Sequence, residues 1–355
     1  MKNINQKNNL QLQKILVNGT PYQRGTQYGE QLRNEIRDFL SDNIARINSA
    51  RFESLTLDKA LSITDTFIPY IERDVPDLAE EIKGLADGAG ISYREGMLLQ
   101  VRREIISSGL ECTAFACRNH QGDSIIAQNV DLAGNLTDLG IILQVNTLSE
   151  EEPDLLMYTH VGLIGYLGLN SFGLGIGLNM VLSSGWRAGV PPYLLIRHLL
   201  HQKNVENCLR EIKRIRRASS RNLLIADKTR LVDVEMTVQD ERIIEENFLV
   251  HTNHYVHPDL LRYDLVEKNT STYPRYERTV RELQQFKGMP SVRHMKDLLG
   301  YHEDGQGSLC VHNGGDPRRV DTIASVILEP SEGKLSACKG HPCNRPFQPY
   351  YLERK

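Results

Sequence analysis

The chain has 355 residues, of which 40% are hydrophobic and 25% are charged, and its formal net charge is −3. These values are close to the globular average, so the chain can bury a sizeable core. Its length suits one large domain or two ordinary ones. The short basic run at residues 213–217 falls at the end of a predicted helix. We therefore exclude nucleic acid as a partner.

The composition also bears on where the protein works. No stretch approaches the roughly 18 consecutive apolar residues of a membrane helix. Residues 1–9 are polar and no apolar region follows them, so we expect no secretory signal and no membrane partner. The six cysteines are spread thinly along the chain, which argues against a disulfide framework. We expect a cytoplasmic protein.

Helical periodicity dominates the first 110 residues. Residues 1–13 are predicted to be a loose polar tail. Apolar residues then recur at helical spacing. Ser92 and Glu95 form a capping-box pattern, which is typical of a helix start. We predict helices at about 22–47, 57–73, 77–87 and 93–105.

From Cys112 onward the pattern changes to alternation with period two, which predicts strands. The turn signal at residues 119–123 predicts a hairpin between the first two. We predict strands at 112–117, 124–129, 140–147, 154–160, 163–169 and 173–180, helices at 192–202 and 205–217, strands at 221–227, 231–237, 242–246 and 248–252, helices at 273–286 and 290–300, and strands at 322–329 and 333–338. This order lacks regular βαβ alternation. It predicts an α+β protein with antiparallel sheets and helices packed outside them.

Cys112 lies at the boundary between these two patterns, at the first position of the first strand. A cysteine attacks as the thiolate, so it needs a base. An α-amino group, with a reference pKa of about 7.7–8.0, can take the thiol proton if the cysteine is the first residue of its chain. We therefore predict that the chain cuts itself before Cys112. Cys117, at an odd offset, should face the other side of the strand and belong to the core.

Several short motifs follow the same order as in one known family. They lie at residues 112–113, 128–131, 165–173, 189–191 and 251–254, with another similarity at residues 19–25. On these motifs the sequence resembles the acyl-coenzyme A:6-aminopenicillanic acid acyltransferase family, the C45 peptidases, which are N-terminal nucleophile hydrolases. The resemblance implies a four-layer αββα fold with two stacked antiparallel sheets.

The resemblance also implies roles for individual residues. Cys112 matches the nucleophile, exposed by autocatalytic cleavage of the Glu111–Cys112 bond. Asp131 matches an aspartate that orients and stabilises the new amine. Asn253 matches an asparagine whose amide helps to form the oxyanion hole. Arg319 matches an arginine that precedes a late strand.

The implied enzyme acts on linear amide (C–N) bonds through a thioester, as a hydrolase or an acyltransferase. Its substrate would be a small-molecule amide or acyl donor, with a coenzyme A thioester as one candidate donor and no other cofactor. The helical fragment 1–111 and the fragment 112–355 would remain one structural unit. Assembly into homo-oligomers is left open.

A second group of residues has the composition of a zinc site. Cys310, His312, Cys338, His341 and Cys343 are zinc-type ligands. Cys310 and His312, two residues apart, are placed awkwardly for one ion. We therefore expect structural cysteines and no metal. A non-catalytic or zinc-stapled binding protein on the same fold is the alternative function. An ordinary Cys/His hydrolase without processing is a further one, although no papain-like signature surrounds Cys112.

Overall fold

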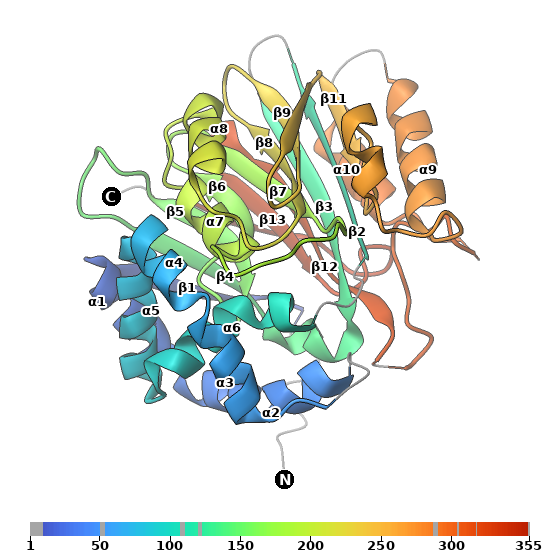
Figure 1. Cartoon of the computed structure of the whole chain (residues 1–355). Helices are drawn as coiled ribbons and strands as arrows, with labels where there is room; N and C mark the ends of the chain where they lie inside the picture. The colour runs from blue at the N-terminus through green and yellow to red at the C-terminus, as the bar shows by residue number, and fades with distance from the viewer. Residues whose placement is uncertain are drawn as a thin grey trace.

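The structure is a computed structural model that describes residues 10–49, 54–106, 111–119, 123–286, 290–303, 305–316 and 318–353. Two β-sheets stack on each other, with helices on their outer sides (Figure 1). The α-helices are α1 (Pro21–Gln31), α2 (Arg33–Ser49), α3 (Leu57–Asp65), α4 (Ile68–Asp74), α5 (Pro76–Ala89), α6 (Tyr93–Ile106), α7 (Pro192–Leu199), α8 (Val205–Arg214), α9 (Thr272–Gln284) and α10 (Val292–Leu299).

One sheet has eight strands in the order β1-β4-β5-β6-β7-β8-β9-β10. Its neighbours pair antiparallel, apart from the parallel pair β1 and β4. The strands are β1 (Gln13–Asn18), β4 (Gly140–Asn146), β5 (Leu155–His160), β6 (Leu167–Asn170), β7 (Gly175–Asn179), β8 (Arg221–Ala226), β9 (Leu231–Met236) and β10 (Glu241–Glu245).

The other sheet has six antiparallel strands in the order β11-β2-β3-β12-β13-β14. They are β2 (Glu111–Arg118), β3 (Ser124–Ala133), β11 (Phe248–His251), β12 (Val320–Glu329), β13 (Lys334–Lys339) and β14 (Gln348–Tyr351). The pairing of β2 with β3 confirms the predicted hairpin.

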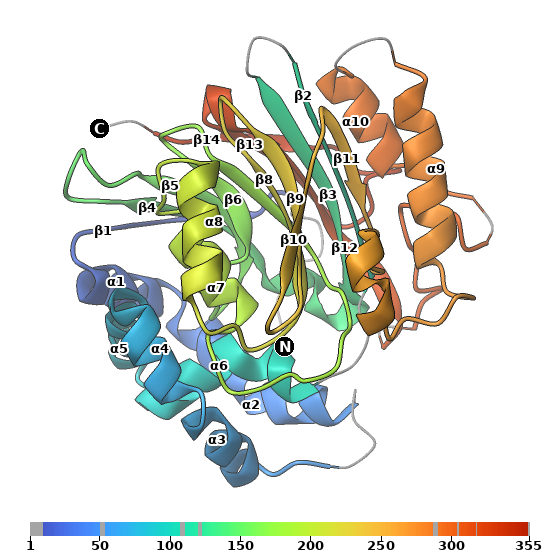
Figure 2. The ribbon, with the colours of Figure 1, turned by 45° about the horizontal axis from the view of Figure 1, so that its top comes forward.

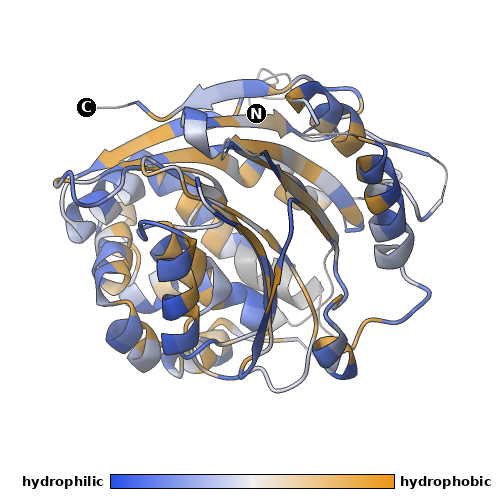
Figure 3. Ribbon diagram, turned by 90° about the horizontal axis from the view of Figure 1, so that it is seen from above, coloured by the Kyte–Doolittle hydropathy of each residue, from blue (hydrophilic) through white to orange (hydrophobic). Residues whose placement is uncertain are grey.

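The helices form the two outer layers. Figure 2 shows α9 and α10 beside the six-stranded sheet and α1–α8 on the side of the eight-stranded sheet. Leu283 of α9 and Met295 of α10 pack in one cluster with Phe115 and Cys117 of β2. Hydrophobic residues concentrate on the strands between the layers (Figure 3). The four-layer αββα fold is therefore confirmed, and Cys117 is a core residue.

Glycines allow the layers to approach closely. A side chain at Gly177 of β7 would place its Cβ only 2.9 Å from Ile126 of β3 in the other sheet. At the crossing of α1 and α5, a Cβ on Gly25 would lie 1.9 Å from the Glu81 carbonyl oxygen. Such distances are far inside van der Waals contact, so a larger residue at either position would push these elements apart.

Two short edge strands were not predicted. In β1 the buried Ile15 and Val17 alternate with the exposed Leu16, so residues 13–18 are a strand that begins at the last residue of the predicted tail. β14 pairs with β13 at the opposite end of the chain. The Leu12 N–H donates to Tyr350 Oη at 3.0 Å, and this hydroxyl donates to the Leu12 carbonyl at 3.1 Å. The N-terminal piece is thus helical with one added strand.

Within the described residues, no helix has both the length and the apolar character required to cross a membrane. All six cysteines are free thiols.

Candidate active site

Three neighbouring strands bring the predicted site residues together. β2 lies between β11 and β3, and its Cys112 pairs with Val130, so Asp131 comes next to it on β3. β11 ends opposite Ala114 of β2. Asn253 follows two residues later, level with Cys112 across the strand pair. Local strand pairing therefore gathers residues that are far apart in the sequence.

Asn253 holds the backbone nitrogen of Cys112. The Cys112 N–H donates to Asn253 Oδ1 at 2.9 Å, and Arg275 Nη2 donates to the same oxygen at 2.9 Å. Asn253 Nδ2 donates to the Met180 carbonyl at 3.0 Å. These partners fix the orientation of the carboxamide, because only its oxygen can accept from two donors. The nitrogen predicted to become an amine therefore already has an acceptor in place.

Arg275, in the first turn of α9, was not predicted to be part of the site. It is fully buried, and its Nη1 donates to the Cys112 carbonyl at 2.8 Å and to Thr113 Oγ1 at 2.7 Å. Thr272, the first residue of the same helix, accepts from the Asn253 N–H at 2.7 Å. The first turn of α9 therefore contacts Cys112 through Arg275 and contacts its partner Asn253 through Thr272.

Asp131 is fully buried beside Cys112. Its Oδ1 accepts from the hydroxyl of Thr322 at 2.6 Å, and Thr322 is its partner on β12. The backbone N–H groups of Asp131 and Met180 favour the thiolate form of Cys112. The Cys112 thiol therefore has both a carboxylate and backbone donors in its surroundings.

Burial controls the reactivity of the Cys112 thiol in the intact chain. Burial, followed by the negative charge of Asp131, raises the pKa of Cys112 to about 12, against the opposing effects of nearby N–H donors and Arg275. The thiol is therefore protonated near neutral pH. Its own backbone nitrogen is an amide in the intact chain and cannot act as the base, whereas a free α-amine could.

Glu111 and Arg319 have different positions relative to this site. Glu111 precedes Cys112 on β2 and pairs with Asp131. Arg319 lies just before β12 with its side chain 74% exposed, and its Nε is 3.8 Å from the Asp316 carboxylate. The guanidinium that contacts Cys112 belongs to Arg275. No sequence signal separated Arg275 from the other charged residues of α9.

A cavity of about 340 Å³ opens beside the site. Three of its lining residues, Met180, Asn253 and Arg275, are the ones that surround Cys112. The rest of the lining is largely apolar and comes mainly from the segment before α9. It comprises Leu182, Leu265, Val266, Glu267, Thr270, Ser271, Thr272 and Val320. This cavity is the candidate substrate pocket.

Buried charges support the strand end that carries Asn253. His251 Nε2 is 2.8 Å from Glu235 Oε1, and both side chains are fully buried. Burial lowers the pKa of His251, but Asp233 and Glu235 outweigh it and raise the pKa above its ordinary value. Burial, with Glu235 adding to it and His251 opposing it, raises the pKa of Asp233 to about 7.

These shifts predict that stability falls between pH 6 and 8. The stabilisation from His251 is complete below its unfolded pKa of about 6.5 and is lost as pH rises through its higher folded value. The folded state likewise favours protonated Asp233. The stabilisation that Asp233 contributes is therefore lost as pH rises from its unfolded pKa of about 3.9 through its folded pKa of about 7. Asp233→Asn should reduce the drop in Tm measured between pH 6 and 8. Asp138→Asn, at a surface position, should retain it, and an equal drop in both variants would contradict this assignment.

Comparison with known proteins connects this site to a family. A family model described as acyl-coenzyme A:6-aminopenicillanic acid acyl-transferase matches residues 117–344. This region contains Asp131, Asn253 and Arg275, and Cys112 lies five residues before it. The acyl-coenzyme A:6-aminopenicillanic-acid-acyltransferase 40 kDa form of Emericella nidulans is 24% identical over 342 residues, 93% of each chain.

Two solved structures also resemble this fold in part. Penicillin V acylase from Agrobacterium tumefaciens has a TM-score of 0.44 and 12% identity, over 64% of this chain and 82% of that one. The N-acylethanolamine-hydrolyzing acid amidase ortholog of Caenorhabditis elegans has a TM-score of 0.45 and 16% identity, over 62% and 93%. The family model, in contrast, covers well over half of the chain. The chain therefore belongs to the acyl-coenzyme A:6-aminopenicillanic acid acyl-transferase family of enzymes.

Proposed function

We propose that the protein cuts itself between Glu111 and Cys112 and then acts on a linear amide bond through a thioester on Cys112. The observation that carries this proposal is the contact between the Cys112 nitrogen and Asn253 Oδ1, with Asp131 on the adjoining strand. A hydrogen-bond acceptor and a carboxylate suit a nitrogen that becomes an α-amine. They would hold it beside its own sulfur.

Self-cleavage requires only groups that the chain supplies, together with water. The Cys112 sulfur attacks the Glu111 carbonyl, the C–N bond breaks, and the nitrogen takes up a proton to become the amine. Water then hydrolyses the thioester, which restores the thiol and leaves a carboxylate on Glu111. Asp131 is the buried acid close enough to take part in moving the thiol proton.

The mature enzyme would use the same groups for its substrate. The freed amine accepts the thiol proton, the sulfur attacks the substrate carbonyl, and the amine returns the proton to the leaving nitrogen. Water gives hydrolysis, and an acceptor amine gives acyl transfer. Asn253 Oδ1 would hold the catalytic amine. Its Nδ2 would stabilise the oxyanion only after giving up its bond to the Met180 carbonyl.

The cavity favours an apolar acyl group as the part of the substrate that binds next to Cys112. Leu182, Leu265 and Val266 supply apolar walls. Arg275 is the single cation among its lining residues, and it is engaged with Cys112, Thr113 and Asn253. If coenzyme A delivers the acyl group, its phosphates would therefore lie outside this cavity.

The two fragments are expected to stay together after cleavage. The hydrophobic core joins side chains from both pieces, such as Ile82 and Leu98 with Ile142 and Leu156. β1 of the first fragment also pairs with β4 of the second. We propose a cytoplasmic, reducing location, in which Cys112 remains a thiol. This pairing of the two fragments does not depend on assembly into homo-oligomers.

Asn253→Ala tests the role of the carboxamide. We expect kcat to fall about 10²–10³-fold, as for the loss of one oxyanion-hole donor, because the variant removes Asn253 Nδ2 together with the acceptor of the Cys112 nitrogen. The matched control is Asn207→Ala on α8, whose side chain contacts Arg210 far from the cavity lining. Steady-state kinetics on a panel of acyl amides, with circular dichroism to confirm folding, provide the measurement. Unchanged kcat in a folded Asn253→Ala enzyme would assign Asn253 to structure alone.

A further inference from the structure

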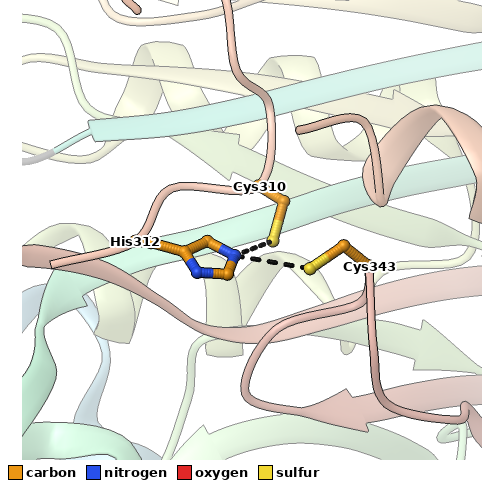
Figure 4. Close-up of side chains that lie close together, drawn as sticks. All are labelled: Cys310, His312 and Cys343. Carbon is orange, nitrogen blue, oxygen red and sulfur yellow. Dashed lines mark hydrogen bonds between the residues drawn. The ribbon is translucent and has the colours of Figure 1, made fainter. Parts of the chain in front are cut away.

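Three side chains of the predicted zinc type converge outside the proposed active site. His312 Nε2 lies 3.4 Å from Cys310 Sγ and 3.3 Å from Cys343 Sγ (Figure 4). The three ligand atoms all lie within 4.8 Å of one another. Cys310 and His312 belong to the loop before β12, and Cys343 belongs to the loop between β13 and β14. Cys338, also considered from the sequence, is not in this group and contacts the carbonyls of Gly340 and Arg345.

Hydrophobic packing does not account for this convergence. Cys310 is buried, but His312 and Cys343 are exposed. Thiols are weak hydrogen-bond donors and acceptors, so these contacts alone give little reason for two exposed groups to meet at a buried sulfur. Three donor atoms pointing at one spot are typical of a metal site.

The imidazole is held in place by its neighbours. The His312 ring lies between those of His302 and His341, with centroid separations of 4.1 and 3.9 Å. His341 is itself anchored to Asp321 at 2.7 Å, and His302 Nδ1 is 2.9 Å from the Cys310 carbonyl. Such outer contacts orient a ligand ring and keep Nε2 directed at the two sulfurs.

The distances suit one particular ion. Zinc bonds of about 2.3 Å to sulfur and 2.0–2.1 Å to nitrogen place tetrahedral S and N ligands about 3.6 Å apart. The observed S–N separations of 3.3 and 3.4 Å are close to this expected value. Two thiolates and one imidazole select zinc over magnesium or calcium, which prefer oxygen ligands. Within the described part of the chain no further Cys, His, Asp or Glu joins the group, so water would complete the tetrahedron.

We propose that Cys310, His312 and Cys343 bind one Zn²⁺ ion that ties the loop before β12 to the loop between β13 and β14. Binding would release the two thiol protons to solvent. The ion would act as a structural staple. It would also help to hold the Asp131 carboxylate, because the Val311 N–H donates to Thr322 Oγ1 at 2.8 Å and this hydroxyl donates to Asp131 Oδ1. Zinc binding itself requires neither self-cleavage nor turnover.

The test uses the full-length protein, stripped with a chelator under reducing conditions and then titrated with Zn²⁺ or Co²⁺. Elemental analysis should find one zinc per chain, and Co²⁺ should give the sulfur-to-metal absorption of a thiolate site. Cys343→Ser, at an exposed position, and His312→Gln should each weaken zinc binding by at least about 10-fold, in line with the cost of perturbing a metal site. The matched control Cys338→Ser should bind zinc normally.

Thermal unfolding gives a second measurement. Zinc should raise the Tm of the wild type, since a ligand bound only to the folded state stabilises it, and should not raise that of Cys343→Ser. The proposal is overturned if the wild type binds no stoichiometric zinc or if the two ligand variants bind it as well as the wild type. A Cys310–Cys343 disulfide in protein isolated from a reducing host would also overturn it. None of these readouts depends on amide hydrolysis or on self-cleavage.

Discussion

Cys112→Ala should leave the chain in one piece and abolish its acyl chemistry. The substitution removes the sulfur that attacks Glu111 during maturation and the substrate afterwards, and no neighbouring hydroxyl occupies its place between Asp131 and Met180 within the described contacts. We expect a single band on a denaturing gel and no turnover above the uncatalysed rate. Both losses arise from one atom, so they should appear together.

Cys117→Ala is the matched control for this prediction. Cys117 lies on the same strand, and its side chain packs with Phe115 and Leu283 on the opposite face of the sheet. The variant should therefore lose only packing energy, and both cleavage and turnover should persist. Cleavage at the same bond in Cys112→Ala would remove the proposed nucleophile from the mechanism.

Arg275→Met should have the second-largest effect. It takes the donors from three buried acceptors, the Cys112 carbonyl, Thr113 Oγ1 and Asn253 Oδ1. Asn253 Oδ1 keeps the Cys112 N–H as a donor, whereas a buried acceptor that loses its donor costs about 1–3 kcal/mol. We therefore expect a loss of several kcal/mol in the free energy of unfolding. Because the Cys112 segment also loses its fixed position, turnover should fall about 10²-fold or more.

Two companion variants distinguish an effect on the position of Cys112 from an effect on the stability of the protein. Arg275→Lys keeps the positive charge, but the lysine ammonium lacks the planar, forked donors that reach three acceptors. The turnover of this variant should therefore lie between those of the wild type and Arg275→Met. Arg278→Met, one turn away on α9, removes partly exposed contacts with Glu282, Glu303 and the Tyr301 ring and should leave turnover unchanged. Urea unfolding and kcat/KM would be measured for all three. Normal kcat/KM in a destabilised Arg275→Met enzyme would restrict Arg275 to a structural role.

Much of the fold could be predicted because the local patterns are strong. The alternating pattern after Cys112 predicted the strands. The hairpin of β2 and β3 then places Asp131 beside Cys112. The short edge strands β1 and β14 were missed because only four to six residues carry their pattern. The predicted helix over 22–47 is two helices, α1 and α2, with Leu32 between them.

The arginine of the site could not be predicted for a physical reason. A charged residue in the first turn of an amphipathic helix ordinarily faces solvent, and Arg275 becomes buried only because α9 packs over β2 and β11 (Figure 2). Arg319 precedes a strand, as the motif required, but its turn leaves the side chain in solvent. Local sequence does not encode such long-range packing.

The same limit applies to the proposed zinc ligands. A spacing of two residues made Cys310 and His312 look incompatible with one ion, and Cys343 is 31 residues beyond His312. Because β12 and β13 pair antiparallel, the chain reverses direction between them. The loop before β12 therefore lies beside the loop after β13. Only the sheet topology reveals the third ligand.

The most direct test of the central claim is the intact mass of the purified wild-type protein under denaturing conditions. We predict two polypeptides, one with the mass of residues 112–355 and a free α-amine on Cys112, the other ending in the carboxylate of Glu111. Their masses should sum to that of the whole chain plus one water. A chain that remains whole, or one that is cut at any other bond, would contradict it.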